Sequence, residues 1–145
     1  MNPWSLVLLA PVLLALVYDL RTREIPDWIP LTAIAWAGLA TAAGLNGLAW
    51  IGLTVGGVLG LGLGAAMFYC ARFGGGDVKL LTAIGAAVGP WILLSVMAWM
   101  AVAGGVLALI AVARGKRDFA YVPAIAFGVL AETLWPGGLA RVLLR

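Results

Sequence analysis

The sequence predicts an all-α, polytopic membrane protein with about six transmembrane helices and its N-terminus outside. Two observations lead to this class. The chain of 145 residues is 64% hydrophobic and only 10% charged, which places it well above the apolar share of soluble domains. Its apolar residues also form runs separated by short polar segments, as expected of helices that cross a bilayer. We therefore expect one integral-membrane domain over residues 1–145.

The candidate spans are six apolar runs in the sequence. In chain order they are Pro3–Tyr18, Ile29–Leu45, Leu48–Cys70, Val78–Val88, Pro90–Ala113 and Phe119–Trp135. The first run lacks the positively charged start and the cleavage pattern of a signal peptide, so we expect it to stay as a span. The second run follows "RTREIPDWIP", whose two prolines favour an extended, turning connection.

The third run carries glycines at every fourth position, and they are Gly52, Gly56, Gly60 and Gly64. This spacing makes a flat stripe on which another helix can pack closely. The predicted role is packing within the fold, and the stripe is also a candidate contact between copies of the chain. The fourth run, Val78–Val88, is short for a span unless Asp77 and Lys79 lie at its mouth.

Charged loop residues give the predicted orientation. The connections after the first, third and fifth spans are basic, whereas the connections at "NG" and "GP" are uncharged. The basic residues are Arg21, Arg23, Arg72, Lys79, Arg114, Lys116 and Arg117. With an outside N-terminus all of them are cytoplasmic, as the positive-inside bias requires. The tail "LARVLLR" departs from this pattern, and we interpret it as a short interfacial helix.

The composition narrows the kinds of chemistry that the chain can perform. The chain has no histidine, which removes the commonest general base and metal ligand, and its one cysteine, Cys70, allows no internal disulfide or Cys-based zinc site. The net charge of +3 fits basic membrane loops better than a nucleic-acid partner. We expect no cofactor, no metal and no nucleic acid.

Two acidic residues stand at span ends on the predicted cytoplasmic side. Asp19 closes the first span and Asp77 opens the fourth, directly after three glycines. Ionisable groups at membrane depth are costly and often mark function. The alternative is structural: Asp19 would be an interfacial residue paired with Arg21 or Arg23, and Asp77 would be an N-cap.

Two facing carboxylates can hydrolyse an amide without a metal. Close like charges cannot both ionise cheaply, so the pair shares a proton. The ionised member activates water, and the protonated member assists the carbonyl oxygen and the leaving amine. Asp77, at a helix N-terminus, would be the anion, and Asp19 would hold the proton.

The three glycines before Asp77 are expected to shape this site. Gly74, Gly75 and Gly76 would let the chain turn sharply and let a substrate backbone approach. The other acids carry weaker signals. Those in loops are interpreted as solvated charges. Glu132 lies inside the sixth span or near its outer end, where burial would require a partner that the sequence does not identify.

Two segments, "YDLRTREIPDW" and "FGGGDVKLLTAIGA", resemble the motifs of the bacterial type IV prepilin peptidase family, a family of GxGD aspartyl membrane proteases. They are most similar to its short form from Flp/Tad pili. The resemblance implies that Asp19 and Asp77 are catalytic. Pro26 belongs to the first motif, and the glycines belong to the second. Lys79 and Asp27 are candidate substrate-orienting residues.

The resemblance also implies a substrate and a location. The substrate would be a prepilin, with a short basic leader joined to an apolar helix, cleaved on the cytoplasmic side of the bacterial inner membrane. Asp27 stands where the family usually has Asn, and "YVPAIAFG" resembles a Pro-rich element of the family only loosely. Nothing in the chain resembles the cysteine-rich methyltransferase segment of longer members, which implies peptidase activity without N-methylation.

Three alternatives remain open at this point. A protease of the presenilin and signal-peptide-peptidase group also has two aspartates, but on consecutive spans. A small proton-coupled transporter or channel subunit would use paired acids and glycine-broken helices near the midplane. An inert assembly protein of the pilus machinery would tolerate Asp19→Asn and Asp77→Asn.

Overall fold

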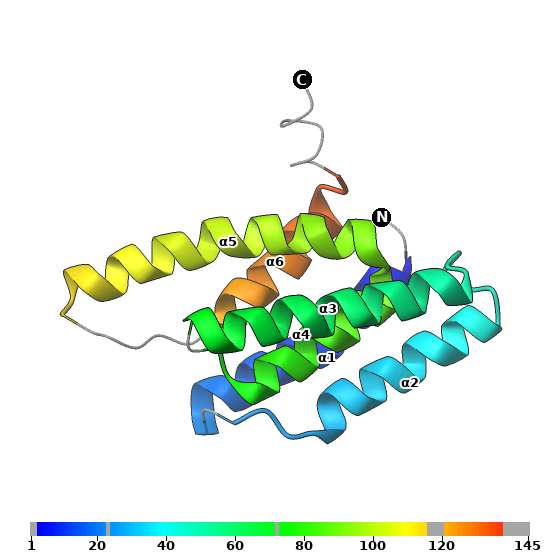
Figure 1. Ribbon diagram of the computed structural model, residues 1–145, viewed down its shortest axis with the longest axis horizontal. Helices are drawn as coiled ribbons and strands as arrows, with labels where there is room; N and C mark the ends of the chain where they lie inside the picture. Colours follow the sequence, from blue (N-terminus) through cyan, green and yellow to red (C-terminus); the bar gives the residue numbers. More distant parts are fainter. Residues whose placement is uncertain (1–2, 23, 72, 116–120, 138–145) are drawn as a thin grey trace.

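The computed structural model describes residues 3–22, 24–71, 73–115 and 121–137, and within these ranges the chain forms six α-helices and no strands. In order they are α1 (Pro3–Thr22), α2 (Trp28–Ala42), α3 (Trp50–Ala71), α4 (Gly75–Val88), α5 (Pro90–Ala113) and α6 (Val122–Leu134). Most of them lie along the long direction of the molecule (Figure 1). The predicted all-α class is confirmed.

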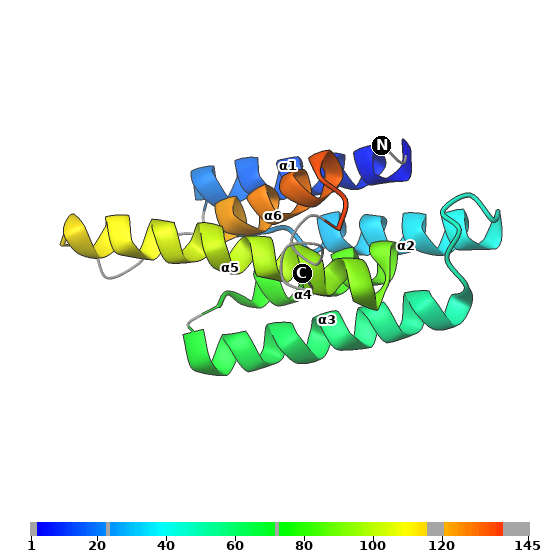
Figure 2. The same cartoon turned by 90° about the horizontal axis from the view of Figure 1, so that it is seen from above.

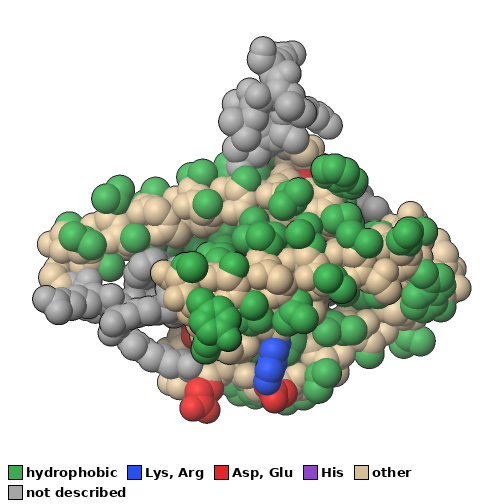
Figure 3. All heavy atoms as spheres, viewed as in Figure 1, with side chains coloured by type: hydrophobic (Ala, Val, Ile, Leu, Met, Phe, Trp, Pro, Cys, Tyr) green, Lys and Arg blue, Asp and Glu red, His purple; other side chains and the backbone are tan. Residues whose placement is uncertain are grey.

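Two of the described helices, α3 and α5, are long and apolar enough to cross a membrane. The others in the bundle are shorter or less apolar, so six crossings and an outside N-terminus stay predictions. The surface agrees with a membrane environment: in Figure 3 hydrophobic side chains are spread over the whole visible face, and the few charged ones lie mainly at its lower edge. The predicted tail helix and the start of the last span at Phe119 fall outside the described residues.

Two helix ends differ from the predicted span ends. Helix α1 continues past Tyr18 to Thr22, so Asp19 lies within the last turn of the helix. The Thr22 hydroxyl donates to the carbonyl oxygens of Tyr18 and Glu24 at 2.9 and 3.1 Å, which closes this helix end. Helix α4 begins at Gly75 rather than at Val78, which places Asp77 in its first turn.

Helix α4 is the centre of the bundle and contacts α1, α2, α3 and α5 (Figure 2). Its closest neighbour is α3, because the glycine stripe of α3 faces it. A Cβ atom at Gly56 would lie 2.1 Å from the carbonyl oxygen of Gly85, and one at Gly60 would lie 2.5 Å from that of Leu81. The predicted close packing is confirmed within the chain. Self-association through α3 stays a prediction, and it would have to use another face of the helix.

The core continues along one face of α1 and one face of α4. Val12 and Ala15 of α1, together with Leu80, Leu81 and Ile84 of α4, are at most 1% exposed and belong to one cluster. Residues spaced by three, four or seven positions share a helix face. Both faces are therefore fixed by core packing, and any residue that continues them must also point inward.

Glu132 has partners that the sequence did not indicate. It is 8% exposed and lies near the C-terminal end of α6. The Ser95 hydroxyl from α5 donates to Glu132 Oε2, and the Gly137 N–H donates to Oε1 at 2.7 Å. The side chain thus joins α5, α6 and the turn after α6.

We expect Glu132→Ala to destabilise the fold by about 1–3 kcal/mol, because it leaves two donors without their acceptor in a buried position. Glu132→Gln keeps an acceptor oxygen and should cost less. Thermal unfolding in detergent micelles measures both variants. An unchanged unfolding temperature for Glu132→Ala would show that the two hydrogen bonds do not stabilise the bundle.

Candidate active site

Asp19 lies on the core-facing side of α1. It follows Val12 by seven positions and Ala15 by four, so it continues their buried face into the last turn. The residue is half-buried, and its Oδ2 atom is buried. Helical spacing therefore turns this carboxylate toward the bundle instead of toward solvent.

Asp77 lies on the core-facing side of α4. It precedes Leu80, Leu81 and Ile84 by three, four and seven positions, and it is 8% exposed. The backbone N–H of Gly74 donates to Asp77 Oδ2 at 3.1 Å. Gly74, not Asp77, is the N-cap, so the N-cap alternative is wrong in detail: Asp77 is the third residue of the helix and bonds back to the cap.

The structure brings the two acids to one end of the bundle. Helix α1 contacts α4. Burial first, and then the negative charge of Asp19, disfavour the charged form of the Asp77 carboxyl, whereas the hydrogen bond from Gly74 favours it. The first turn of α4 also favours an anion through the helix dipole. Two neighbouring carboxylates in a partly desolvated place hold a proton between them more readily than isolated ones.

The glycines before Asp77 act differently from the expected sharp turn. Gly74 has extended backbone, with φ −72° and ψ 151°, and Gly75 and Gly76 are already helical. Their role is to let neighbouring groups lie close to the backbone. A Cβ atom at Gly76 would lie 2.9 Å from Cβ of Ile25, and one at Gly74 would lie 3.2 Å from Asp77 Oδ2. Gly76 therefore lets the segment after α1 lie against the start of α4, Gly74 leaves room for the Asp77 carboxylate, and Gly75 faces open space.

Asp27 and Lys79 pair with each other. Lys79 Nζ donates to Asp27 Oδ1 at 2.6 Å, and the side chains of Lys79 and Asp27 are 54% and 66% exposed respectively. Asp27 occupies the N-cap position directly before α2, but its side chain makes no capping hydrogen bond. Together with the contact of Ile25 on Gly76, this ion pair joins the two sequence motifs. Pro26, which stands between Ile25 and Asp27 in the chain, is half-buried. Its carbonyl oxygen accepts a hydrogen bond from the Ile29 N–H at 3.1 Å.

A double-mutant cycle tests the Asp27–Lys79 pair. We expect Asp27→Ala and Lys79→Ala each to lower the free energy of unfolding by no more than about 1 kcal/mol, because the pair is exposed. The double variant should lose less than the sum, and the exchange Asp27→Lys with Lys79→Asp should restore part of the loss. Strictly additive losses would show that the two side chains do not stabilise each other.

Two aromatic residues at this end were missed in the sequence. Phe73, directly before the glycines, is 2% exposed, and its ring packs edge-on against Tyr121 with 5.2 Å between the ring centroids. Tyr121 precedes α6, which has Pro123 in its first turn. The contact brings the start of "YVPAIAFG" beside the glycine segment. The sequence held one signal for this contact, because the aromatic residue Phe73 stands directly before the glycine motif.

Comparison with known proteins agrees with these motifs. The model of the type IV leader peptidase family matches residues 6–109. This range includes Asp19, Asp77 and the segments that join them. No curated protein and no solved structure matches the chain.

Proposed function

Because this chain belongs to the type IV leader peptidase family, we propose that it is an aspartyl endopeptidase that removes the leader peptide of prepilins. The observation that carries this proposal is the placement of Asp19 and Asp77. They come from helices that are far apart in the sequence but in contact in the bundle, in the last turn of α1 and the first turn of α4. The family match extends over both residues and supports peptide-bond hydrolysis as their task.

The proposed mechanism uses one proton and one water molecule. In the proposed mechanism the N-terminus of α4 and the Gly74 N–H at 3.1 Å stabilise the Asp77 anion against the cost of its burial. Asp77 takes a proton from water as the water attacks the scissile carbonyl. Asp19 holds the proton that goes first to the carbonyl oxygen and then assists the leaving amine. The two carboxyl groups titrate as a unit. The residue that holds the shared proton can therefore change between the steps of the reaction.

We place this site at the cytoplasmic face of the bacterial inner membrane. Arg21 and Arg114 lie at or just beyond helix ends that the topology assigns to the cytoplasm, and Lys79 lies in the second turn of α4 near such an end. Basic residues of this kind stay on the cytoplasmic side. In this topology the helices of the bundle form six crossings with an outside N-terminus. The substrate's basic leader would then emerge on the side where both acids lie.

The position of the acids favours a protease over a transporter. Asp19 is in the last turn of α1 and Asp77 is in the first turn of α4. A transporter of the broken-helix type holds its ions near the middle of the membrane, whereas these carboxylates lie at a helix end. An end position suits a peptide bond at the junction between an apolar helix and a polar leader.

The test is leader removal by the purified chain in liposomes. We expect a candidate pilin precursor to lose its leader, as measured by mass spectrometry of the product. EDTA should leave the rate unchanged, because the proposed chemistry uses only two carboxylates. An intact precursor after incubation with the folded chain, across a panel of pilins, would exclude the proposed activity. A rate abolished by EDTA and restored by a divalent cation would contradict the mechanism.

A further inference from the structure

The peptide group between Phe73 and Gly74 supplies a hydrogen bond to the candidate active site. Its N–H donates to Asp77 Oδ2 at 3.1 Å, and Gly74 has extended backbone at this point. A hydrogen bond to a carboxylate favours the charged form, but only while the N–H points at the oxygen. The orientation of this one peptide group therefore affects how readily Asp77 carries a negative charge.

Gly74 is fixed on one side by α4 and on the other side by Phe73. Its carbonyl oxygen accepts a hydrogen bond from the Val78 N–H at 3.2 Å, which belongs to the start of the helix. Gly74 itself has no side chain to anchor it, and glycine backbone is the most permissive of all. The side chain of Phe73, in contrast, is 2% exposed and belongs to the hydrophobic core cluster. The packing of this ring therefore decides how far the backbone can rotate about the N–Cα bond of Gly74.

Tyr121 packs against the Phe73 ring from outside the two motifs. The rings meet edge-on with 5.2 Å between their centroids, and Tyr121 directly precedes Val122, the buried first residue of α6. Helix α6 packs against α1, the helix that carries Asp19. The family match ends at residue 109, so it assigns no role to Tyr121. The ring pair thus joins the segment before α4 to α6 and, through α6, to α1.

We propose that Phe73 is a positioning residue for leader cleavage: its ring, packed against Tyr121, keeps the Gly74 N–H directed at Asp77. This inference rests on the proposed function. When the ring packing loosens, rotation about the N–Cα bond of Gly74 turns the N–H away, and the Asp77 anion that takes the proton from water loses a hydrogen bond. A ring pair that only filled the core would stabilise the fold and leave the chemistry of Asp77 unchanged.

The pH profile of kcat for the full chain in liposomes tests this role. Phe73→Leu keeps an apolar side chain but removes the ring contact. We expect the acid limb of the profile, where the Asp19–Asp77 pair gains its second proton, to move to higher pH by about one unit, because the charged form loses a hydrogen bond. Below this limb kcat should fall by about tenfold, and the loss should disappear as the pH rises. KM for the precursor should stay within about twofold of the wild-type value.

The variants keep every charged residue of the chain. Of the four helices that contact α4, α2, α3 and α5 contain no charged residue, and α1 contains Asp19 and Arg21. Asp27, before α2, is paired with Lys79 of α4. Tyrosine and cysteine side chains titrate well above the acid range. A shifted acid limb therefore reports a changed environment of the existing carboxyl groups and not a new titrating group.

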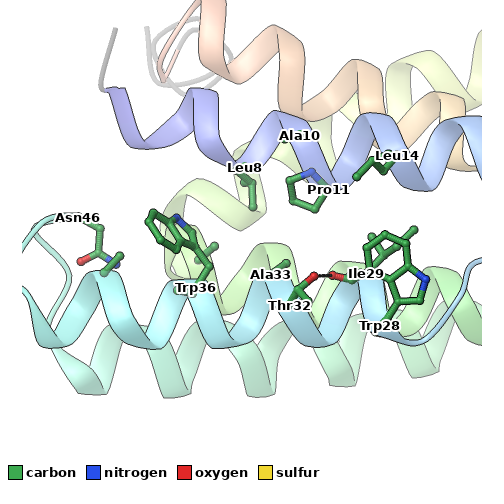
Figure 4. Close-up of a pocket in the computed structure, with 13 residues that line it drawn as sticks. Leu8, Ala10, Pro11, Leu14, Trp28, Ile29, Thr32, Ala33, Trp36 and Asn46 are labelled. Carbon is green, nitrogen blue, oxygen red and sulfur yellow. Dashed lines mark hydrogen bonds between the residues drawn. The ribbon is translucent and has the colours of Figure 1, made fainter.

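A core substitution elsewhere distinguishes positioning from lost stability. Leu8 is 7% exposed and points into an apolar cavity of about 240 Å³ between α1 and α2 (Figure 4). It lies about 16 Å along α1 from Asp19, and none of the described residues that line the cavity is charged. Leu8→Ala should lower the unfolding temperature and leave the acid limb at its wild-type pH. The proposal is overturned if Phe73→Leu also leaves the limb in place, whether or not its rate falls.

Solution NMR in detergent micelles detects the hydrogen bond without any cleavage. In the sequence only Gly74 and Gly128 directly follow a phenylalanine, so carbonyl-labelled phenylalanine with nitrogen-labelled glycine selects two amide signals. An amide proton bonded to a carboxylate moves downfield when that carboxylate ionises. The Gly74 signal should move with pH in the wild-type chain, not move in Asp77→Asn, and move about half as far or less in Tyr121→Leu. Gly128, inside α6, is the internal reference. Equal movement in Tyr121→Leu and the wild-type chain overturns the role of the ring pair.

These outcomes separate the positioning role from the peptidase activity. If the wild-type chain cleaves no precursor, the proposed function fails, and the assignment of Phe73 to leader cleavage fails with it. If the wild-type chain cleaves and Phe73→Leu keeps the wild-type pH profile, only the positioning role fails. Should Phe73→Leu fail to fold, the Gly74 signal in Tyr121→Leu still decides.

Discussion

Asp77→Asn is expected to reduce leader cleavage by about 10²- to 10⁴-fold, the range that a positioned acid or base contributes. The asparagine has nearly the same shape, and its carbonyl oxygen can still accept from the Gly74 N–H that now bonds Asp77 Oδ2 at 3.1 Å. The fold and the start of α4 should therefore persist while the proton-accepting group is lost. The measurement is the initial rate with precursor at saturation in liposomes.

A matched acid-to-amide substitution distinguishes loss of the proton-accepting group from loss of a negative charge at this end of the bundle. Glu24 is exposed and lies at the same end of the bundle, in the segment between α1 and α2. Glu24→Gln should stay within about fivefold of the wild-type rate, as expected of an exposed charge. If Asp77→Asn also stays within that range, Asp77 does not act in the chemical step.

Gly56→Ala is expected to destabilise the bundle by about 3 kcal/mol or more, at the upper end of overpacking effects. The added Cβ atom would lie 2.1 Å from the carbonyl oxygen of Gly85 and 2.9 Å from its carbonyl carbon. These are backbone atoms, so no side-chain rotation relieves the contact, and α3 must move away from α4. Thermal unfolding in detergent and the folded fraction on size exclusion measure the effect.

The same substitution at a position of α3 that faces open space should not destabilise the bundle. Gly62 also lies on α3, but a Cβ atom added there would meet no other atom within 4 Å, and alanine is a better helix former than glycine by about 1 kcal/mol. Gly62→Ala should therefore be neutral or stabilising. Similar losses in the two variants would mean that glycine acts through helix propensity or flexibility and not through contact with α4.

The sequence predicted the helical class and the approximate helix positions because apolar runs set them directly. The bounds Pro90–Ala113 agree at both ends, since "GP" fixes the start and a basic segment follows the end. The first and fourth helices were placed less well. Polar residues at their ends looked like loop, although Asp19 and Asp77 continue buried helical faces. Hydropathy alone cannot separate an inward-facing acid from a solvated one.

Contacts between segments that are distant in the sequence were harder to predict than the helices. The two motifs indicated that Asp19 and Asp77 belong to one site, but they gave no sign that Asp27 would bond Lys79. The ion pair gives the exposed Asp27 carboxylate a partner from the second motif. Nor could one sequence show that Ser95 donates to Glu132 across the α5–α6 contact, because neither position has a distinctive spacing.

The central claim is that Asp19 and Asp77 meet at one end of the bundle, and pairwise thiol bridging tests it most directly. In a Cys70→Ser chain, which removes the exposed native thiol, Asp19→Cys is combined with Asp77→Cys or with Leu48→Cys. Leu48 and Leu8 line one cavity, and Leu8 lies about 16 Å along α1 from position 19. Mass spectrometry of the membrane-embedded chain, after treatment with a short bifunctional thiol reagent, measures bridging. The account predicts a bridge between positions 19 and 77 and none between positions 19 and 48. It is contradicted if positions 19 and 77 fail to bridge while each reacts with a monofunctional maleimide.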